Sequence, residues 1–184
     1  SAGETADIYW GSTSTTPKTA VTVGSTGSLS ASITVPASGI GNHYIIAKGR
    51  TSGKQGAALF NTSASISMVQ SGGTVGSTVQ ASLRGFSPGE SVQVNFFTTS
   101  SASRQVATVV TSSTGSATAS FTVPVSYFGS HKVEGVAGSS GSRVSTTFSV
   151  RGSMTLAPGT VSAGTTFGVS LRGFGLRESV RISF

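Results

Sequence analysis

An internal repeat constrains the fold of this chain more than any other feature of its sequence. The tetrapeptide LRGF occupies residues 83–86 and again 171–174, which is 88 positions later. The tripeptide TVP occupies residues 34–36 and again 122–124, with the same spacing of 88. A fixed period of this kind indicates a tandem array of one structural unit.

One unit is therefore 86 to 88 residues long, and the chain divides into three ranges. Residues 1–64 match the later part of a unit, residues 65–152 form one complete unit, and residues 153–184 match the opening of a third. Glu4 precedes its counterpart Glu90 by 86 positions rather than 88, which predicts a two-residue insertion in a loop of the complete unit.

The complete unit shows the alternation of apolar and polar residues that is typical of half-buried strands. In one predicted strand, for example, Val92, Val94 and Phe96 share a face. Seven strands are predicted, over residues 65–70, 78–84, 91–97, 105–111, 116–123, 130–137 and 143–150. Short strands with this spacing favour an all-β fold in which two antiparallel sheets form a sandwich.

The composition favours a folded chain and excludes several kinds of site. Hydrophobic residues make up 36% of the sequence and Phe occurs 10 times, which argues against a disordered linker rich in Ser, Thr and Gly. The chain has no Cys, so it forms no disulfide and no thiolate metal site. Its carboxylates are too few for an acidic calcium cage, and we expect no metal and no cofactor. They are Glu4, Asp7, Glu90, Glu134 and Glu178.

The net charge of +7 results from the scarcity of acidic residues more than from an abundance of basic ones. Lys and Arg are scattered singly along the chain, so we expect no nucleic-acid partner. No apolar run approaches the ~18 residues that a membrane span needs. Weak attraction to an anionic cell-wall polymer fits this charge better.

The motifs of the complete unit resemble those of bacterial immunoglobulin-like repeats of the IPT/TIG or Big type. The resemblance rests on GFSPGE at residues 85–90, on FTVP at 121–124 and on G-x-H at 129–131, and it covers the whole chain. It implies tandem seven-stranded immunoglobulin-like β-sandwiches in a large secreted or cell-surface protein. Members of such families mostly serve as stalks, spacers, adhesin shafts or accessory domains, and no catalytic residue is implied by the resemblance.

The rare ionisable residues recur from unit to unit, which favours structural roles. His43 and His131 are equivalent, and no repeated carboxylate and Ser accompany them, so a hydrogen-bonded structural histidine is favoured over an acid–base catalyst. Glu4, Glu90 and Glu178 are also equivalent, and we expect them to accept hydrogen bonds from turn N–H groups. The sequence therefore predicts no catalytic residue.

The aromatic residues supply the candidates for binding. Trp10 is equivalent to Phe96, so it is predicted to be a core residue rather than a platform for a sugar. Tyr127 and Phe128 lie in a predicted loop, and together with Tyr44 they are the candidate interaction residues. The alternative interpretation is that these side chains close one end of the hydrophobic core.

The two ends of the chain are complementary. Residues 1–64 lack the first two strands of their unit, and residues 153–184 contain such strands. Unpaired sheet edges recruit strands, so the C-terminal segment of one subunit could complete the next subunit. A section of a longer continuous array accounts for the same boundaries. Residues 175–184 repeat residues 1–10, so the third strand is present at both ends of the chain, which argues against a simple exchange. The candidate strand-complementation residues are Met154, Leu156, Phe167, Val169 and Leu171.

The sequence thus predicts a structural extracellular repeat protein that forms a stalk, fibre or filament shaft on the bacterial surface. Its expected partners are neighbouring units or subunits of its own kind. The alternative is a carbohydrate-binding or cell-wall-binding adhesin module of a secreted protein. A binding module would carry exposed aromatic residues in one unit and not in its repeats, whereas an enzyme would carry an unrepeated polar cluster in a pocket.

Overall fold

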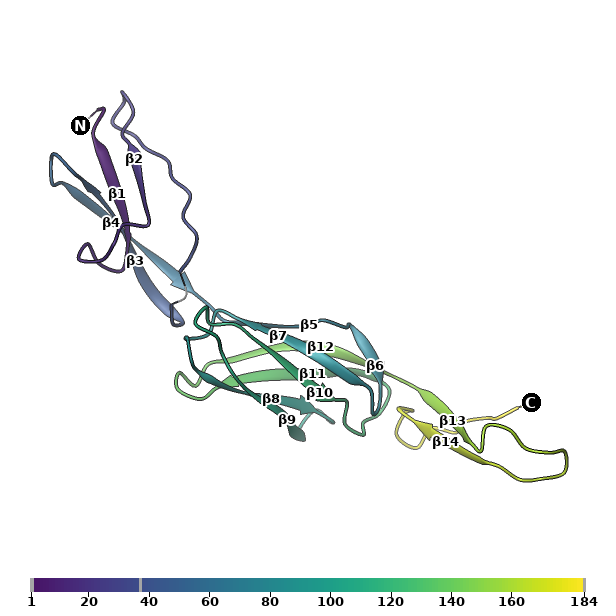
Figure 1. The fold of residues 1–184 in the computed structure, drawn as a ribbon. Coiled ribbons are helices and arrows are strands. Elements are labelled where there is room, and N and C mark those ends of the chain that lie inside the picture. The colour runs from purple at the N-terminus through teal and green to yellow at the C-terminus, as the bar shows by residue number, and fades with distance from the viewer. Residues whose placement is uncertain (1, 37, 184) are drawn as a thin grey trace.

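The computed structural model describes residues 2–36 and 38–183. All the regular secondary structure in that part of the chain is β-strand. The strands form four sheets, two of which pack together in the middle of an extended molecule, with one sheet at either end (Figure 1). The prediction of an all-β fold is confirmed. Since these residues form no helix, none of them belongs to a helix that could cross a membrane.

The N-terminal sheet has the strand order β2-β1-β3-β4, and all its pairs are antiparallel. Its strands are β1 (Thr5–Trp10), β2 (Thr19–Thr22), β3 (Gly41–Gly49) and β4 (Gln55–Thr62). Residues 28–35, which the 88-residue period aligns with 116–123, form no strand in the structure. In the complete unit that strand pairs with β7, whereas the described residues 2–36 and 38–64 include no counterpart of β7.

The central unit consists of two sheets that face each other across a core. One sheet has the order β10-β7-β5 and the other the order β6-β12-β11-β8-β9. The strands are β5 (Ser65–Met68), β6 (Gly72–Thr74), β7 (Thr78–Arg84), β8 (Ser91–Phe97), β9 (Ser103–Val110), β10 (Ala117–Thr122), β11 (Gly129–Ala137) and β12 (Arg143–Arg151). This arrangement is consistent with a β-sandwich.

Inward residues of both sheets build the core of the central unit. Leu83 from one sheet and Phe96 and Phe148 from the other are fully buried, and so is Phe86 in the turn after β7. Burial of each such side chain contributes ~1.5–3 kcal/mol. The alternation read from the sequence is therefore the alternation between the core and the solvent.

The first predicted strand of the central unit, at 65–70, differs from the structure. It ends at Met68 as β5, which pairs with β7, and the chain then crosses to the other sheet as β6, which lies outside the predicted range and runs parallel to β12. The crossing depends on glycine, because a Cβ at Gly72 would lie 2.7 Å from the carbonyl oxygen of Ser149. The prediction of purely antiparallel sheets is therefore wrong at this one pair of strands.

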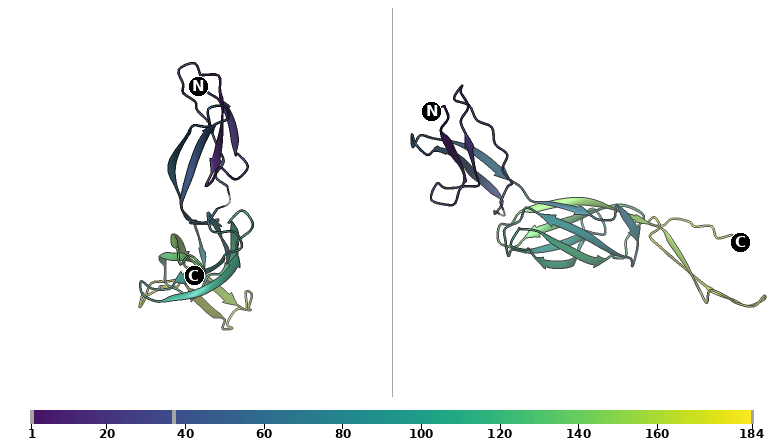
Figure 2. Two further views of the ribbon diagram at one scale, coloured as in Figure 1. Left: turned by 90° about the vertical axis from the view of Figure 1, so that its left-hand side faces the viewer. Right: turned by 45° about the horizontal axis from the view of Figure 1, so that its top comes forward.

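The C-terminal hairpin consists of β13 (Ser153–Ala157) and β14 (Gly168–Arg172). Its register repeats that of β5 and β7, since Met154 lies opposite Leu171 just as Ile66 lies opposite Leu83. The hairpin projects from the far end of the central unit, away from the N-terminal sheet (Figures 1 and 2). No second sheet covers it among the described residues.

Candidate functional site

The two junctions between successive units are built from equivalent glycines. Gly85 has a φ of +75°, and a Cβ there would lie 2.5 Å from the carbonyl oxygen of Ser63. Gly173, 88 positions later, has a φ of +69°, and a Cβ there would lie 2.6 Å from the carbonyl oxygen of Arg151. Both glycines permit a left-handed turn and a close approach to the segment that links the two units.

Equivalent aromatic turn residues follow these glycines. Phe86 is fully buried, and Ile40 of the preceding unit packs against the same core cluster. At the second junction the backbone N–H of Phe128, the equivalent of Ile40, donates to the carbonyl oxygen of Phe174 over 3.3 Å. Each junction thus joins a loop of one unit to a turn of the next.

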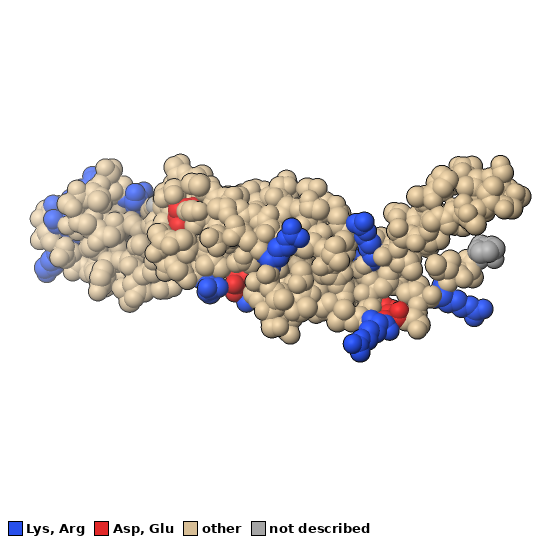
Figure 3. Space-filling model, turned by 90° about the horizontal axis from the view of Figure 1, so that it is seen from below, with Lys and Arg blue, Asp and Glu red and all other residues tan. Residues whose placement is uncertain are grey.

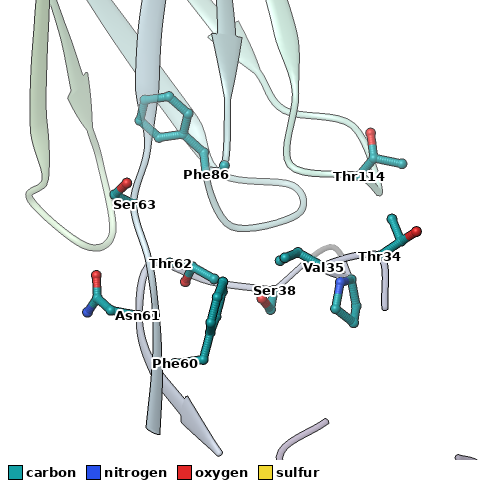
Figure 4. Close-up of a pocket in the computed structure, with 11 residues that line it drawn as sticks. Thr34, Val35, Ser38, Phe60, Asn61, Thr62, Ser63, Phe86 and Thr114 are labelled. Atoms are coloured by element: carbon teal, nitrogen blue, oxygen red, sulfur yellow. The ribbon is translucent and has the colours of Figure 1, made fainter. Parts of the chain in front are cut away.

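A cavity of about 570 Å³ lies at the first junction (Figure 4). Its walls come from both units, with Phe60 and Val35 on one side and Phe86 and Thr114 on the other. None of the described residues that line it is titratable. The cavity can accommodate an apolar side chain, but its lining offers no group for acid–base chemistry.

The two histidines connect loops to strands within their units. The ring of His131 is buried, with Nδ1 2.8 Å from the carbonyl oxygen of Phe97 and Nε2 2.8 Å from that of Tyr127. It stacks on Phe96 with a centroid distance of 5.2 Å. The Nε2 atom of His43 lies 2.9 Å from the carbonyl oxygen of Gly39. Neither histidine has a nucleophile and a carboxylate arranged around it among these contacts.

Glu90 connects two turns at one end of the central unit. It is buried, and it accepts hydrogen bonds from the backbone N–H groups of Ser87 and Ser140 and from the hydroxyl of Ser139. Burial alone would raise the pKa of Glu90, but these hydrogen bonds lower it to about 2. Glu4 occupies the equivalent position in the N-terminal unit, and its carboxylate accepts a hydrogen bond from the backbone N–H of Thr51. No group of three or more metal-ligating side chains occurs among the described residues.

The three candidate interaction residues lie in two different units of the structure. Tyr127 contacts His131 with a ring-centroid distance of 4.6 Å, and Phe128 is 60% exposed beside the second junction. Tyr44 is 56% exposed but belongs to β3 of the N-terminal sheet. They therefore do not form one binding site.

The sequence analysis missed the neighbours of Tyr44. Leu59 lies directly opposite Tyr44 on β4 and is 59% exposed. Tyr9 lies opposite Ile46 on the same sheet. The sequence signal was the apolar run at residues 57–60, but the register of the hairpin was needed to place Leu59 beside Tyr44.

Four of the candidate strand-complementation residues lie on one face of the C-terminal hairpin, because Met154 lies opposite Leu171 and Leu156 lies opposite Val169. The fifth, Phe167, immediately precedes β14. Met154 is 53% exposed, and Leu156 and Phe167 are each 45% exposed. Val169 and Leu171 are half-buried. The hairpin therefore presents an apolar face to solvent.

The N-terminal sheet presents an apolar face of the same kind. Phe60 is 41% exposed, whereas its equivalent Phe148 in the central unit is fully buried. Trp10 lies on this face, with its ring centroid 4.9 Å from that of His43 and 5.6 Å from that of Phe60. In the central unit the sheet that contains β5 and β7 covers the equivalent face.

The sequence matches no protein family model and no curated protein. Among solved structures the chain is similar to the tetra-tandem repeat in the extending region of a large adhesion protein, with 18% identity and a TM-score of 0.40 over 94% of this chain. It is also similar to the BSP domain of a biofilm-associated protein, with 18% identity and a TM-score of 0.34 over 80% of this chain. The chain spans 50% of the first structure and 24% of the second.

Proposed function

We propose that this chain is a section of an extracellular array of immunoglobulin-like β-sandwiches, which acts as a stalk or shaft on a bacterial surface. The equivalence of the two junctions carries the proposal, because Gly85 approaches Ser63 as Gly173 approaches Arg151. When successive junctions are built alike, each unit is related to the next by a similar step, and the array extends in one direction.

The topology of the central unit supports the immunoglobulin-like part of the proposal. Its first strand is divided between two sheets, and the larger sheet has the order β6-β12-β11-β8-β9. Seven-stranded immunoglobulin-like domains also consist of two facing sheets. One sheet contains the first two strands, and the other contains the third, sixth and seventh. The interpretation counts β5 and β6 as two parts of one strand.

The use of the polar side chains supports a structural role without catalysis. Glu90 and His131, two of the repeated ionisable groups of the central unit, both contact backbone groups of the fold. Their hydrogen bonds hold turns and loops at the ends of the sandwich, where neighbouring units meet. We therefore assign these residues to the geometry of the array.

We further propose that separate copies of this chain associate by strand complementation. The exposed apolar faces of the N-terminal sheet and of the C-terminal hairpin correspond to the two halves of one sandwich. A hairpin from one copy would cover Phe60 and Trp10 of another, in the manner in which β5 and β7 cover β12 and β8. Such a head-to-tail contact leads to open chains of subunits.

Two solution measurements test these proposals separately. Small-angle X-ray scattering at low concentration should yield an elongated particle, and a compact particle would contradict the array proposal.

Sedimentation velocity should reveal association that increases with concentration. Leu156→Asp should abolish that association, whereas Thr155→Asp, on the opposite face of the same strand, should not. Association that both variants leave intact, or a monomer at every concentration, would reject strand complementation.

A further inference from the structure

The outer face of the N-terminal sheet carries an apolar strip of four residues. Tyr9 on β1 lies opposite Ile46 on β3, and Tyr44 on β3 lies opposite Leu59 on β4. Because side chains alternate between the two faces of a sheet, these four residues share one face, and the buried Ile8 lies on the other. Tyr44 and Leu59 are the most exposed members, at 56% and 59%.

The central unit has no such strip. The equivalents of Tyr9, Tyr44, Ile46 and Leu59 are Asn95, Lys132, Glu134 and Thr147. Glu134 is held there by ion pairs, 2.6 Å from the Nζ atom of Lys132 and 3.0 Å from a guanidinium nitrogen of Arg143. The fold therefore does not require apolar residues at these positions, and the strip occurs in the N-terminal unit but not in the central unit.

The strip also remains at the surface when the N-terminal unit is completed. The face that a second sheet would cover is the one that carries Ile8, Trp10 and Phe60. The strip lies on the opposite face, so neither preceding residues nor a hairpin from another copy needs to bury it. Its exposure is thus independent of how the array is assembled.

Polar groups flank the strip at both ends. At one end Lys48 lies opposite Asp7, and Arg50 donates two hydrogen bonds to the Asp7 carboxylate over 2.8 Å and 3.0 Å. Two cations thus face one carboxylate, and Lys and Arg gather at this end of the molecule (Figure 3). At the other end the side-chain amide of Asn61 donates to that of Asn42 over 2.8 Å.

We propose that this strip binds an extended anionic polysaccharide, a polymer of sugars that carry carboxylates. The tyrosine rings offer apolar surface for the faces of sugar rings and hydroxyl groups for hydrogen bonds. Lys48 supplies the positive charge that is left over beside the Asp7–Arg50 ion pair and attracts the carboxylates, and the amides of Asn42 and Asn61 bind sugar hydroxyls. The distance from Asn42 to Lys48 along β3 is about 20 Å, which suits a polymer segment on a flat sheet.

The charge pattern favours a polysaccharide over a nucleic acid. Binding to a strand of nucleic acid relies on a groove of cations that follows successive phosphates. Here the cations lie at one end of the strip, while amides and aromatic rings occupy the rest. Hydroxyl-rich sugars with spaced carboxylates match that distribution better.

The test is to titrate the 184-residue chain with fluorescently labelled polygalacturonate, with dextran as a neutral polymer and single-stranded DNA as another polyanion. We expect the chain to bind polygalacturonate more tightly than either, with affinity that falls as salt is raised. The double variant Tyr44→Ser, Leu59→Thr should bind about tenfold more weakly. Val110→Thr, which removes an equally exposed apolar side chain from the central unit, should bind as the parent does.

Three results would overturn the proposal. One is no binding of polygalacturonate, or equal binding of dextran. Another is binding that the double variant retains although its thermal unfolding matches that of the parent. The last is tighter binding of DNA, which would assign the face to nucleic acid. None of these results bears on the shape or the association of the chain, so the array proposal stands or fails separately.

Discussion

The backbone N–H of Ser140 donates a hydrogen bond to Oε1 of Glu90 over 3.0 Å. These residues lie 50 positions apart, in two turns that would otherwise be independent. The bond fixes the turn before β8 to the turn between β11 and β12. Since the Glu90 carboxylate also accepts from Ser87 and Ser139, its ionised form is the one that the folded state selects.

Acid should therefore weaken the central unit through Glu90. The pKa of Glu90 is lowered from 4.5 to about 2 in the folded state, so its charge stabilises the fold above pH 4.5. This contribution should be lost as the pH falls from 4.5 towards 2. Glu90→Ala should lower the free energy of unfolding by ~2 kcal/mol at neutral pH and flatten this part of the pH profile. Urea unfolding at a series of pH values measures both effects.

The equivalent residue Glu178 provides the control for this experiment. It is exposed, because the described residues of the C-terminal segment contain no partner turn like that of Ser139 and Ser140. Glu178→Ala should leave the unfolding of the central unit within ~0.5 kcal/mol of the parent. An equal loss from both variants would mean that the loss reflects net charge and not the hydrogen bonds.

Gly85 and Gly89 allow the cost of a close junction to be separated from the cost of a left-handed backbone. Both have positive φ, at +75° and +71°, but a Cβ at Gly89 meets nothing within 4 Å. Gly89→Ala should cost ~1 kcal/mol of unfolding free energy. Gly85→Ala should cost a further ~1–3 kcal/mol because its Cβ would meet the carbonyl oxygen of Ser63. If the two variants lose similar amounts of unfolding free energy in thermal or urea unfolding, the junction accommodates the Cβ at residue 85 without a further loss of stability.

Much of the central unit could be predicted from periodicity alone. The strands predicted at 78–84 and 91–97 coincide with β7 and β8, because alternation in a half-buried strand reports directly on its two faces. The division of the first strand could not be predicted, because it depends on how Gly72 approaches a strand that lies far away in sequence. Local pattern contains no information about such a partner.

The candidate interaction residues show the same limit. Tyr44 could be selected by its residue type, but its neighbours Leu59 and Tyr9 come from other strands and are placed by register. Conversely, Tyr127 was selected as a loop aromatic, yet its ring packs against His131. Composition identifies which side chains can bind, and only the pairing of strands shows which of them lie together.

His131 should matter more for stability than its equivalent His43. Phe at position 131 keeps a ring against Phe96, but it removes the ring nitrogens that lie 2.8 Å from the carbonyl oxygens of Phe97 and Tyr127. His131→Phe should therefore cost ~2 kcal/mol of unfolding free energy. His43→Phe, at a partly exposed site, should cost less than ~1 kcal/mol. Equal losses of unfolding free energy in urea would reject a special role for the polar contacts of the buried His131 ring.

Phe148 and Phe60 are equivalent, yet the first is fully buried and the second is 41% exposed. Phe148→Ala should cost ~3–5 kcal/mol of unfolding free energy at any protein concentration, because it leaves a cavity in a closed core. Phe60→Ala should cost about 1 kcal/mol in dilute solution. If hairpins from other copies cover the N-terminal sheet, the cost of Phe60→Ala should rise with concentration, since the parent then gains from association.

The single Trp makes the two effects separable in one experiment. Trp10 contacts Phe60, so its fluorescence reports unfolding of the N-terminal unit, while circular dichroism is dominated by the larger central unit. Phe148→Ala should shift the dichroism transition, and Phe60→Ala should shift the fluorescence transition. In the parent, the fluorescence midpoint should increase with protein concentration and the dichroism midpoint should not. A fluorescence midpoint that is independent of concentration would mean that no second copy covers the face of Phe60.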